Sequence, residues 1–147
     1  MKKYIPAAII AVLFFCAGLI VSAFARNTKN QQDPGYILDH EKEIAQQQPG
    51  PHDGGGTTTA HNFFAKAADC KLVFRKRILH PGSSIGYHLQ KEDEIYYVVS
   101  GTGEMKMNGK TFPVTAGDAI LTRPGSSHGL TQTGKEDLVI IINYEKK

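Results

Sequence analysis

The chain has 147 residues, of which 41% are hydrophobic and 21% are charged, so it can bury one core and has little room for a second. Its 17 basic and 14 acidic side chains nearly balance, and it contains no tryptophan. This composition offers no basic stripe for phosphates and argues against a nucleic-acid-binding protein. The sequence therefore predicts a single domain without a nucleic-acid partner.

The first 25 residues differ in character from the rest of the chain. Two lysines precede an apolar run over residues 5–21, and Ala23-Phe24-Ala25 then supplies small residues at the two positions that a signal peptidase reads. This pattern predicts a secretory signal peptide over residues 1–25, and hence an exported protein that is periplasmic or secreted. The alternative is an uncleaved anchor, because the apolar run is close to the shorter limit for spanning a bilayer. Only in that case would the protein be attached to a membrane.

Residues 26–60 are polar and interrupted by proline and glycine, and we interpret them as an N-terminal arm ahead of a barrel domain over residues 61–147. A short helix is expected over residues 39–47, because Asp39 can cap it. The triple glycine at residues 54–56 is interpreted as a linker, since a phosphate cradle needs a preceding strand and a following helix. No role is assigned to the three histidines at positions 40, 52 and 61.

From residue 61 onward, short runs with β-forming residues alternate with glycine, proline and asparagine at a spacing of about 8 to 12 residues, which predicts an all-β sandwich or barrel. Asn108-Gly109 predicts a type I′ turn and a hairpin over residues 103–115. The apolar run 138–142 lacks polar alternation, so we expect it to be buried on both faces or to lie in a dimer interface. The predicted strands are 71–79, 84–90, 94–100, 103–107, 111–115, 119–122, 126–132 and 138–144.

Side chains that can bind a metal lie on three of these predicted strands. His88 and Gln90 are two residues apart and share a face, and Glu94 opens the neighbouring antiparallel strand. His128 lies early on a later strand, on the same face as Gln132. Two imidazoles and one carboxylate form the facial set that leaves open positions on Fe(II) and similar metals.

Two segments within residues 72–144 resemble the two sequence motifs of the cupin superfamily. The first motif is carried by Gly82, His88, Glu94 and Gly101, with Gln90 where the family has a second histidine. The second motif is carried by a later set of residues, Gly117, Gly125 and His128, with Arg123 where the family has proline. The resemblance implies a double-stranded β-helix, or jelly-roll barrel.

The same resemblance implies one divalent metal ion, which can be Fe, Mn, Ni or Zn. The sequence carries no motif for an organic cofactor. The ligands of the metal would be His88, Gln90, Glu94 and His128. An amide oxygen is a weaker ligand than imidazole, so Gln90 can bind the metal, hold a water or bond a substrate.

Other polar residues of the predicted barrel are candidates for a pocket wall. Tyr96 shares the face of Glu94, and with Gln132 it is a possible pocket residue. Arg75 and Arg77 share one face of the first predicted strand, which is either exposed to solvent or an anion-binding wall; we favour solvent.

The expected function is that of a metal-dependent enzyme acting on a small polar molecule, with the metal as Lewis acid. Sugar or uronate isomerisation and oxygenation both fit. The alternative is a non-catalytic module that binds a small molecule or a sugar. No catalytic residue is assigned, because Glu92 and Asp93 both lie in a turn. A homodimer is expected from the apolar last strand.

Overall fold

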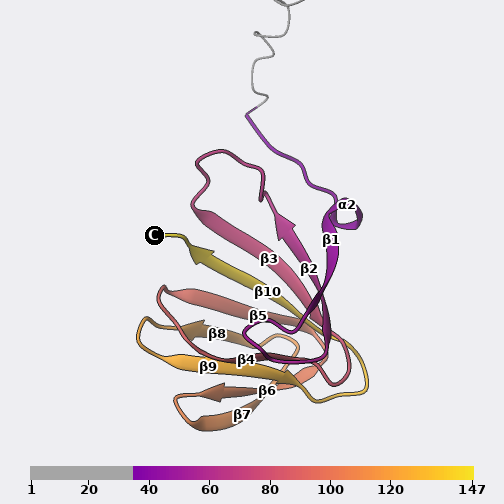
Figure 1. Cartoon of the computed structure of the whole chain (residues 1–147), viewed down its shortest axis with the longest axis vertical. Helices are drawn as coiled ribbons and strands as arrows, with labels where there is room; N and C mark the ends of the chain where they lie inside the picture. The colour runs from indigo at the N-terminus through magenta and orange to yellow at the C-terminus, as the bar shows by residue number, and fades with distance from the viewer. Residues whose placement is uncertain (1–34) are drawn as a thin grey trace, which may run out of the picture. The chain divides into compact units, whose positions relative to one another are not determined.

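The computed structural model describes residues 35–147, and the predicted signal peptide lies outside these residues and stays a prediction. The described chain is almost entirely β, with one short helix (Figure 1). No helix in this part of the chain has the length and hydropathy needed to cross a membrane. The elements are α2 (Glu41–Ile44), β1 (Ala45–Pro49), β2 (Thr57–Phe63), β3 (Leu72–Leu79), β4 (Ser84–Leu89), β5 (Glu94–Ser100), β6 (Thr102–Met107), β7 (Lys110–Thr115), β8 (Ala119–Thr122), β9 (Ser127–Gln132) and β10 (Leu138–Glu145).

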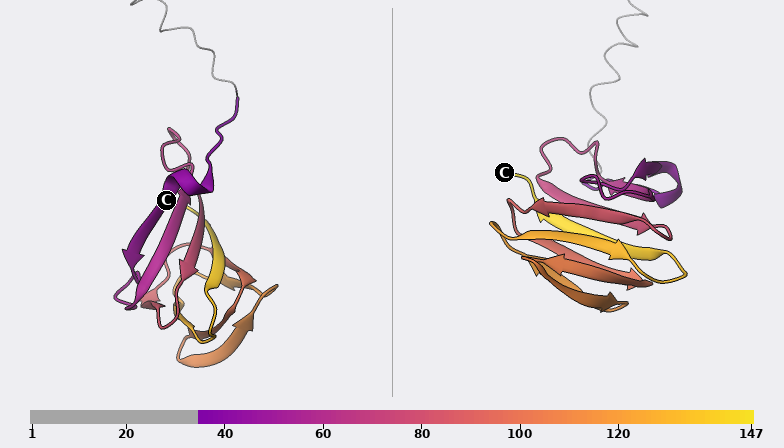
Figure 2. Two further views of the ribbon diagram at one scale, coloured as in Figure 1. Left: turned by 90° about the vertical axis from the view of Figure 1, so that its right-hand side faces the viewer. Right: turned by 60° about the horizontal axis from the view of Figure 1, so that its bottom comes forward.

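Two antiparallel sheets make up the fold. The first has six strands in the order β1-β2-β3-β10-β5-β8, and the second has four in the order β4-β9-β6-β7. In Figures 1 and 2 the β1–β2 hairpin lies at one end of the stack of strands and the β6–β7 hairpin at the other. Most other neighbouring strands, such as β3 and β10 or β4 and β9, come from distant parts of the sequence, as in a jelly roll. The architecture confirms the predicted all-β fold class.

All eight strands predicted after residue 61 are confirmed, with ends that differ by one residue at most. The predicted β6–β7 hairpin is confirmed as well, since Asn108 and Gly109 have φ angles of 49° and 80°. Both angles lie in the left-handed region that a type I′ turn requires, which asparagine and glycine adopt more readily than other residues.

The segment before residue 61 differs from the prediction. The helix expected over residues 39–47 is confined to Glu41–Ile44, and the chain is extended from Ala45 onward. β1 pairs with β2, and β2 pairs in turn with β3, so this polar segment extends the six-stranded sheet. A run of glutamines carries no hydrophobic alternation, and for that reason β1 left no strand signal in the sequence.

The core lies between the inner faces of the two sheets. Side chains alternate strictly along β5, where Glu94, Tyr96 and Val98 are buried while their neighbours face outward. The predicted burial of both faces of residues 138–142 is wrong for the single chain, because only the inner side chains of β10 are fully buried. The apolar core consists of Leu79, Ile85, Tyr96, Val98, Met105, Val114, Leu130, Leu138, Ile140 and Ile142.

Candidate metal centre

A β-bulge on β4 aims His88 into the barrel. Ile85 pairs with Leu130 and His88 pairs with His128, so two residues of β4 lie opposite the single residue Gly129 of β9. Such a bulge shifts the alternation of its strand by one position. Ile85 and His88 therefore both face inward, although they are three residues apart in sequence.

The structure brings His88, Glu94 and His128 together, each from a different strand. One ligand atom from each residue lies within 4.8 Å of the others. The Nε2 atom of His128 is 3.5 Å from Oε2 of Glu94. The side chain of His128 is fully buried and that of Glu94 is 9% exposed, so the cluster lies on the inner surface of the barrel.

The atoms of this cluster suit a divalent cation. Oε2 of Glu94 and Nδ1 of His128 are buried and have no hydrogen-bond partner among the described residues. Nδ1 of His88 lies 2.8 Å from the Gly86 carbonyl oxygen, to which it donates, and this leaves the Nε2 lone pair free. Ligands at about 2.1 Å from an ion lie about 3.0 Å apart when adjacent and about 4.2 Å apart when opposite. In a facial set all three ligands are adjacent, so atoms that now lie within 4.8 Å of one another would draw closer to hold an ion.

Tyr96 borders the cluster from β5, beside Glu94. Its hydroxyl group lies 3.0 Å from Nε2 of His128. Burial, followed by the nearby Glu94 carboxylate, raises the pKa of Tyr96 well above its usual value. The phenol therefore stays protonated at neutral pH and offers a hydrogen to the imidazole or to a bound ligand.

His52, to which the sequence analysis gave no role, stacks on His88. The two ring centroids are 3.6 Å apart and the ring planes differ by 9°. His52 belongs to the loop between β1 and β2, whose Pro51 carbonyl oxygen accepts a hydrogen bond of 2.9 Å from the Gly86 amide. Proline, aspartate and glycines around His52 predict a turn, but nothing local in the sequence indicates which strand that turn contacts.

Burial is the main cause that lowers the pKa of both stacked histidines. The neighbouring rings lower these pKa values further: His88 and His128 act on His52, and His128 acts on His88. Because folding favours the neutral rings, their contribution to stability is complete above the unfolded pKa of about 6.5 and is lost as the pH falls through the lowered folded values. We expect the melting temperature of metal-free protein to fall between about pH 7 and about pH 5. Thermal melts in EDTA measure this. The fall should be shallower in His88→Gln, and equal slopes in both proteins would contradict the assignment.

Gln90, predicted as a metal ligand, and Gln132, predicted as a possible pocket residue, lie in different places. Gln90 follows β4, is 6% exposed, and its backbone bonds to Gly125 and Ser126 in the loop before β9. Its role as a ligand stays a prediction. Gln132 lies four residues beyond His128, about 13 Å along β9. Its amide accepts from the Gly82 amide and donates to two carbonyl oxygens of the loop before β10, so it anchors loops and is not brought to the cluster.

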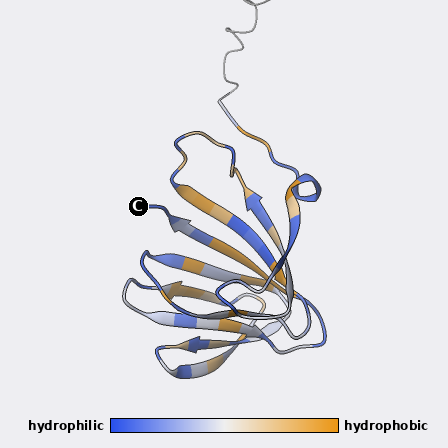
Figure 3. Ribbon diagram, viewed as in Figure 1, coloured by the Kyte–Doolittle hydropathy of each residue, from blue (hydrophilic) through white to orange (hydrophobic). Residues whose placement is uncertain are grey.

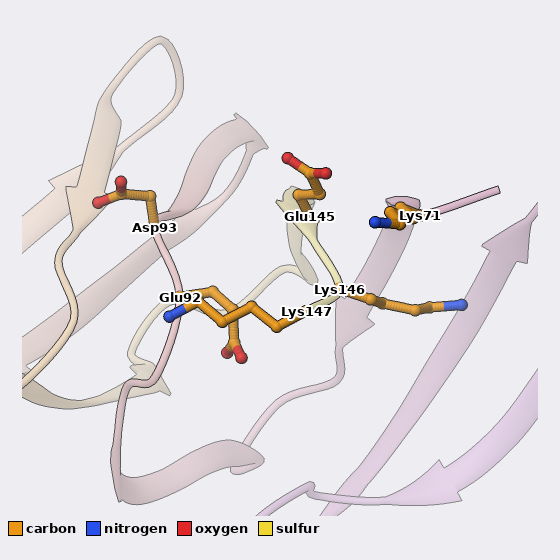
Figure 4. Close-up of a pocket in the computed structure, with 6 residues that line it drawn as sticks. All are labelled: Lys71, Glu92, Asp93, Glu145, Lys146 and Lys147. Carbon is orange, nitrogen blue, oxygen red and sulfur yellow. The ribbon is translucent and has the colours of Figure 1, made fainter.

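The acidic turn between β4 and β5 lies outside the cluster. Glu92 and Asp93 line a surface pocket together with lysines of the C-terminus, as Figure 4 shows. Asp93 also forms an ion pair of 2.6 Å with Arg123. These contacts agree with leaving both carboxylates without a catalytic role.

A two-sheet antiparallel barrel with a His, Glu and His cluster on its inner face defines a cupin, and the cupin domain model matches residues 76–144. The chain belongs to the cupin superfamily. It is similar to the oxalate-binding protein of Thermotoga maritima, with 45% identity over 86 residues that cover 57% of this chain and 71% of that protein.

Solved structures with the same architecture include a predicted oxalate decarboxylase from Thermotoga maritima. That structure has a TM-score of 0.69 and 31% identity, and the alignment covers 76% of this chain and all of that one. A polyketide cyclase from Streptomyces resistomycificus has a TM-score of 0.66 at 19% identity, covering 76% of this chain and 80% of that one. At 19% identity the cyclase bears on the fold alone.

Proposed function

We propose that the protein is an exported cupin that binds a small carboxylate of the oxalate class at a divalent metal held by His88, Glu94 and His128. The observation that carries the proposal is the convergence of these three side chains within 4.8 Å on the inner face of the barrel. The similarity to a protein named oxalate-binding supports the class of ligand. Residues 1–25, as a signal peptide, support export, which fractionation of cells would test.

Each residue of the centre has a distinct part in this proposal. The imidazoles of His88 and His128 and the carboxylate of Glu94 would hold the ion, which when bound supplies a Lewis acid for carboxylate oxygens. The Gly86 carbonyl fixes the ring orientation of His88. The protonated hydroxyl of Tyr96, 3.0 Å from His128, would donate a hydrogen bond to the ligand. The stacked ring of His52 would limit the access of water from the side of the β1–β2 loop.

Binding without turnover is favoured over the isomerase chemistry expected from the sequence. An isomerase needs a general base that is not occupied as a metal ligand. The side chains described in contact with the cluster are those of Tyr96 and His52. The pKa of Tyr96 is raised, which makes it a poor base at neutral pH, and the ring of His52 is stacked face to face on His88. Decarboxylation of oxalate stays a second outcome of the same experiment, because a structural relative is named as a predicted decarboxylase.

The test is titration of the purified protein, loaded with Mn(II), Fe(II), Ni(II) or Zn(II), with oxalate, followed by calorimetry. We expect saturable binding of one oxalate per chain that EDTA weakens strongly, and no binding of neutral sugars. Assays for formate and carbon dioxide on the same samples distinguish turnover from binding. Failure of all four loaded forms to bind oxalate would reject the proposed function.

A homodimer is part of the same proposal. The outer face of the six-stranded sheet exposes large apolar side chains on neighbouring strands, with Ile95, Tyr97 and Leu121 between 45% and 53% exposed. Ile141 of β10 pairs with Tyr97 and continues this face. Apolar faces of this kind are typical of subunit contacts. Sedimentation at the mass of a single chain would contradict the dimer.

A further inference from the structure

A buried arginine lies on the inner face of β3, where the sequence analysis favoured solvent. Figure 3 shows a hydrophilic stretch in the middle of an otherwise apolar β3. Within it, Arg77 is 3% exposed, so the prediction of a solvent face is wrong for this residue. Arg77 pairs with the buried Ile140 of β10, and paired residues share a face, so its side chain projects to the interior.

The guanidinium group of Arg77 has neutral partners. Nη1 donates to Oγ1 of Thr58 at 2.8 Å, and Nη2 lies 3.5 Å from Oε1 of Gln48. Nε is buried without a hydrogen-bond partner, and none of the carboxylates in residues 35–147 forms an ion pair with this residue. A buried charge is costly unless an opposite charge or further hydrogen bonds compensate it. The group is thus a fixed cation with an unused donor.

A second guanidinium strengthens the positive charge on this face. Arg75 lies two residues before Arg77 on the same side of β3, and its Nε donates to Oδ1 of Asn62 at 2.5 Å. Burial, followed by repulsion from Arg75, lowers the pKa of Arg77. An arginine nevertheless stays protonated in proteins. Two like charges on one inner face favour an anion between the sheets.

Arg77 shares the inner face of the six-stranded sheet with Glu94 and Tyr96. The row from Arg77 passes through Ile140 to Val98, two residues beyond Tyr96 on β5, and spans two strand spacings, or about 10 Å between backbones. Tyr96 contacts His128. Gln48 and Thr58, the two partners of Arg77, pair at the base of the β1–β2 loop, and this loop places His52 on His88. Burial and His88 are the main causes that lower the pKa of His52, and the charge of Arg77 lowers it further.

We propose that Arg77 is the anion-binding residue of this protein, receiving the carboxylate of a small dicarboxylate whose other end reaches His88, Glu94 and His128. The inference rests on the proposed function and adds to it a recognition residue outside the metal-binding motifs. The planar guanidinium fork matches a carboxylate in geometry and in charge. A neutral partner for Thr58 and Gln48 would tie the β1–β2 hairpin to β3 equally well, so support of the hairpin alone does not require a buried charge.

The experiment compares oxalate binding to Mn(II)-loaded wild type, Arg77→Gln and Arg77→Lys. We expect Arg77→Gln to bind oxalate about 10- to 100-fold more weakly, because a charge-assisted pair is lost. Arg77→Lys keeps the charge without the fork and should show a smaller loss. Mn(II) affinity should stay within about threefold of wild type in both variants. Lys76→Gln, which removes a charge from the outer face of the same strand, serves as the matched control and should change oxalate affinity less than about twofold.

The outcomes separate this inference from the function on which it rests. If wild type binds oxalate and Arg77→Gln binds it within twofold, the role of Arg77 is rejected while the metal-centred function stands. If loaded wild type does not bind oxalate, the proposed function fails first. If Arg77→Gln does not fold, oxalate binding to the metal-free wild-type protein is the deciding measurement. Arg77 should then still bind oxalate weakly, and added salt should abolish this binding. No binding to the metal-free protein at millimolar oxalate would then overturn the inference.

Discussion

Glu94→Gln and His88→Gln should each lower the bound metal from about one ion per chain to less than about a tenth after dialysis, which corresponds to an affinity loss of at least about 100-fold. Glu94→Gln replaces an anionic ligand by a neutral amide of the same shape, and His88→Gln removes the free Nε2 lone pair. Elemental analysis of dialysed protein measures the content. A thermal shift on metal addition provides a second readout, since an ion that binds only the folded state stabilises it.

The control for both variants is His40→Gln. His40 precedes α2, its side chain makes no capping hydrogen bond, and it is exposed. Its replacement should leave the metal content and the thermal shift unchanged. If Glu94→Gln and His88→Gln both kept a full equivalent of metal, the ion would bind elsewhere and the candidate centre would be wrong.

Gly86→Ala should destabilise the protein by about 2 to 4 kcal/mol and remove the His52–His88 stack. A Cβ at position 86 would overlap the backbone oxygen of His52, and neither backbone can yield easily. Gly54 on the loop faces Ser84 with equally little space, so the loop and β4 meet through two glycines. Urea denaturation gives the free energy of unfolding, and limited proteolysis of the β1–β2 loop reports whether it has detached.

Gly129→Ala is the graded control for this experiment. Gly129 lies on the neighbouring strand β9, opposite the bulge, and a Cβ there would meet the nearest atom, the Ile85 oxygen, at 3.0 Å. The structure therefore predicts a smaller loss of stability and an intact loop. Equal losses in Gly86→Ala and Gly129→Ala, with the loop still protected from protease in both, would show that the loop does not depend on close packing against β4.

Much of the barrel could be predicted because its signals are local. Alternation alone places Glu94 and Tyr96 on the inner face of β5, and Asn108-Gly109 fixes the β6–β7 turn within two residues. Glu94 and His128 are far apart in sequence, and their approach was predicted from the spacing of the two cupin motifs, which carries information about contacts between distant residues.

What could not be predicted depends on pairing between distant segments. His52 meets His88 only because the β1–β2 loop docks on β4, and a glutamine-rich β1 gives no sign that it joins a sheet. Arg77 has the sequence context of a solvent-exposed basic run, and only the register of β3 against β10 shows that it points inward. Burial of a charge runs against the usual preference of arginine, so composition favours the wrong face.

The β-bulge on β4 makes the backbone conformation of this strand a condition for the chemistry. Since Gly86 and Tyr87 together lie opposite Gly129, the inward parity of the strand changes between Ile85 and His88. Without the bulge, plain alternation from Ile85 over the same number of residues would turn the imidazole of His88 outward, toward the solvent side now occupied by Leu89. Loss of the bulge at unchanged length would abolish the centre with every proposed ligand still present in the sequence. The bulge at Gly86 and Tyr87 is therefore as much a part of the site as the ligand residues themselves.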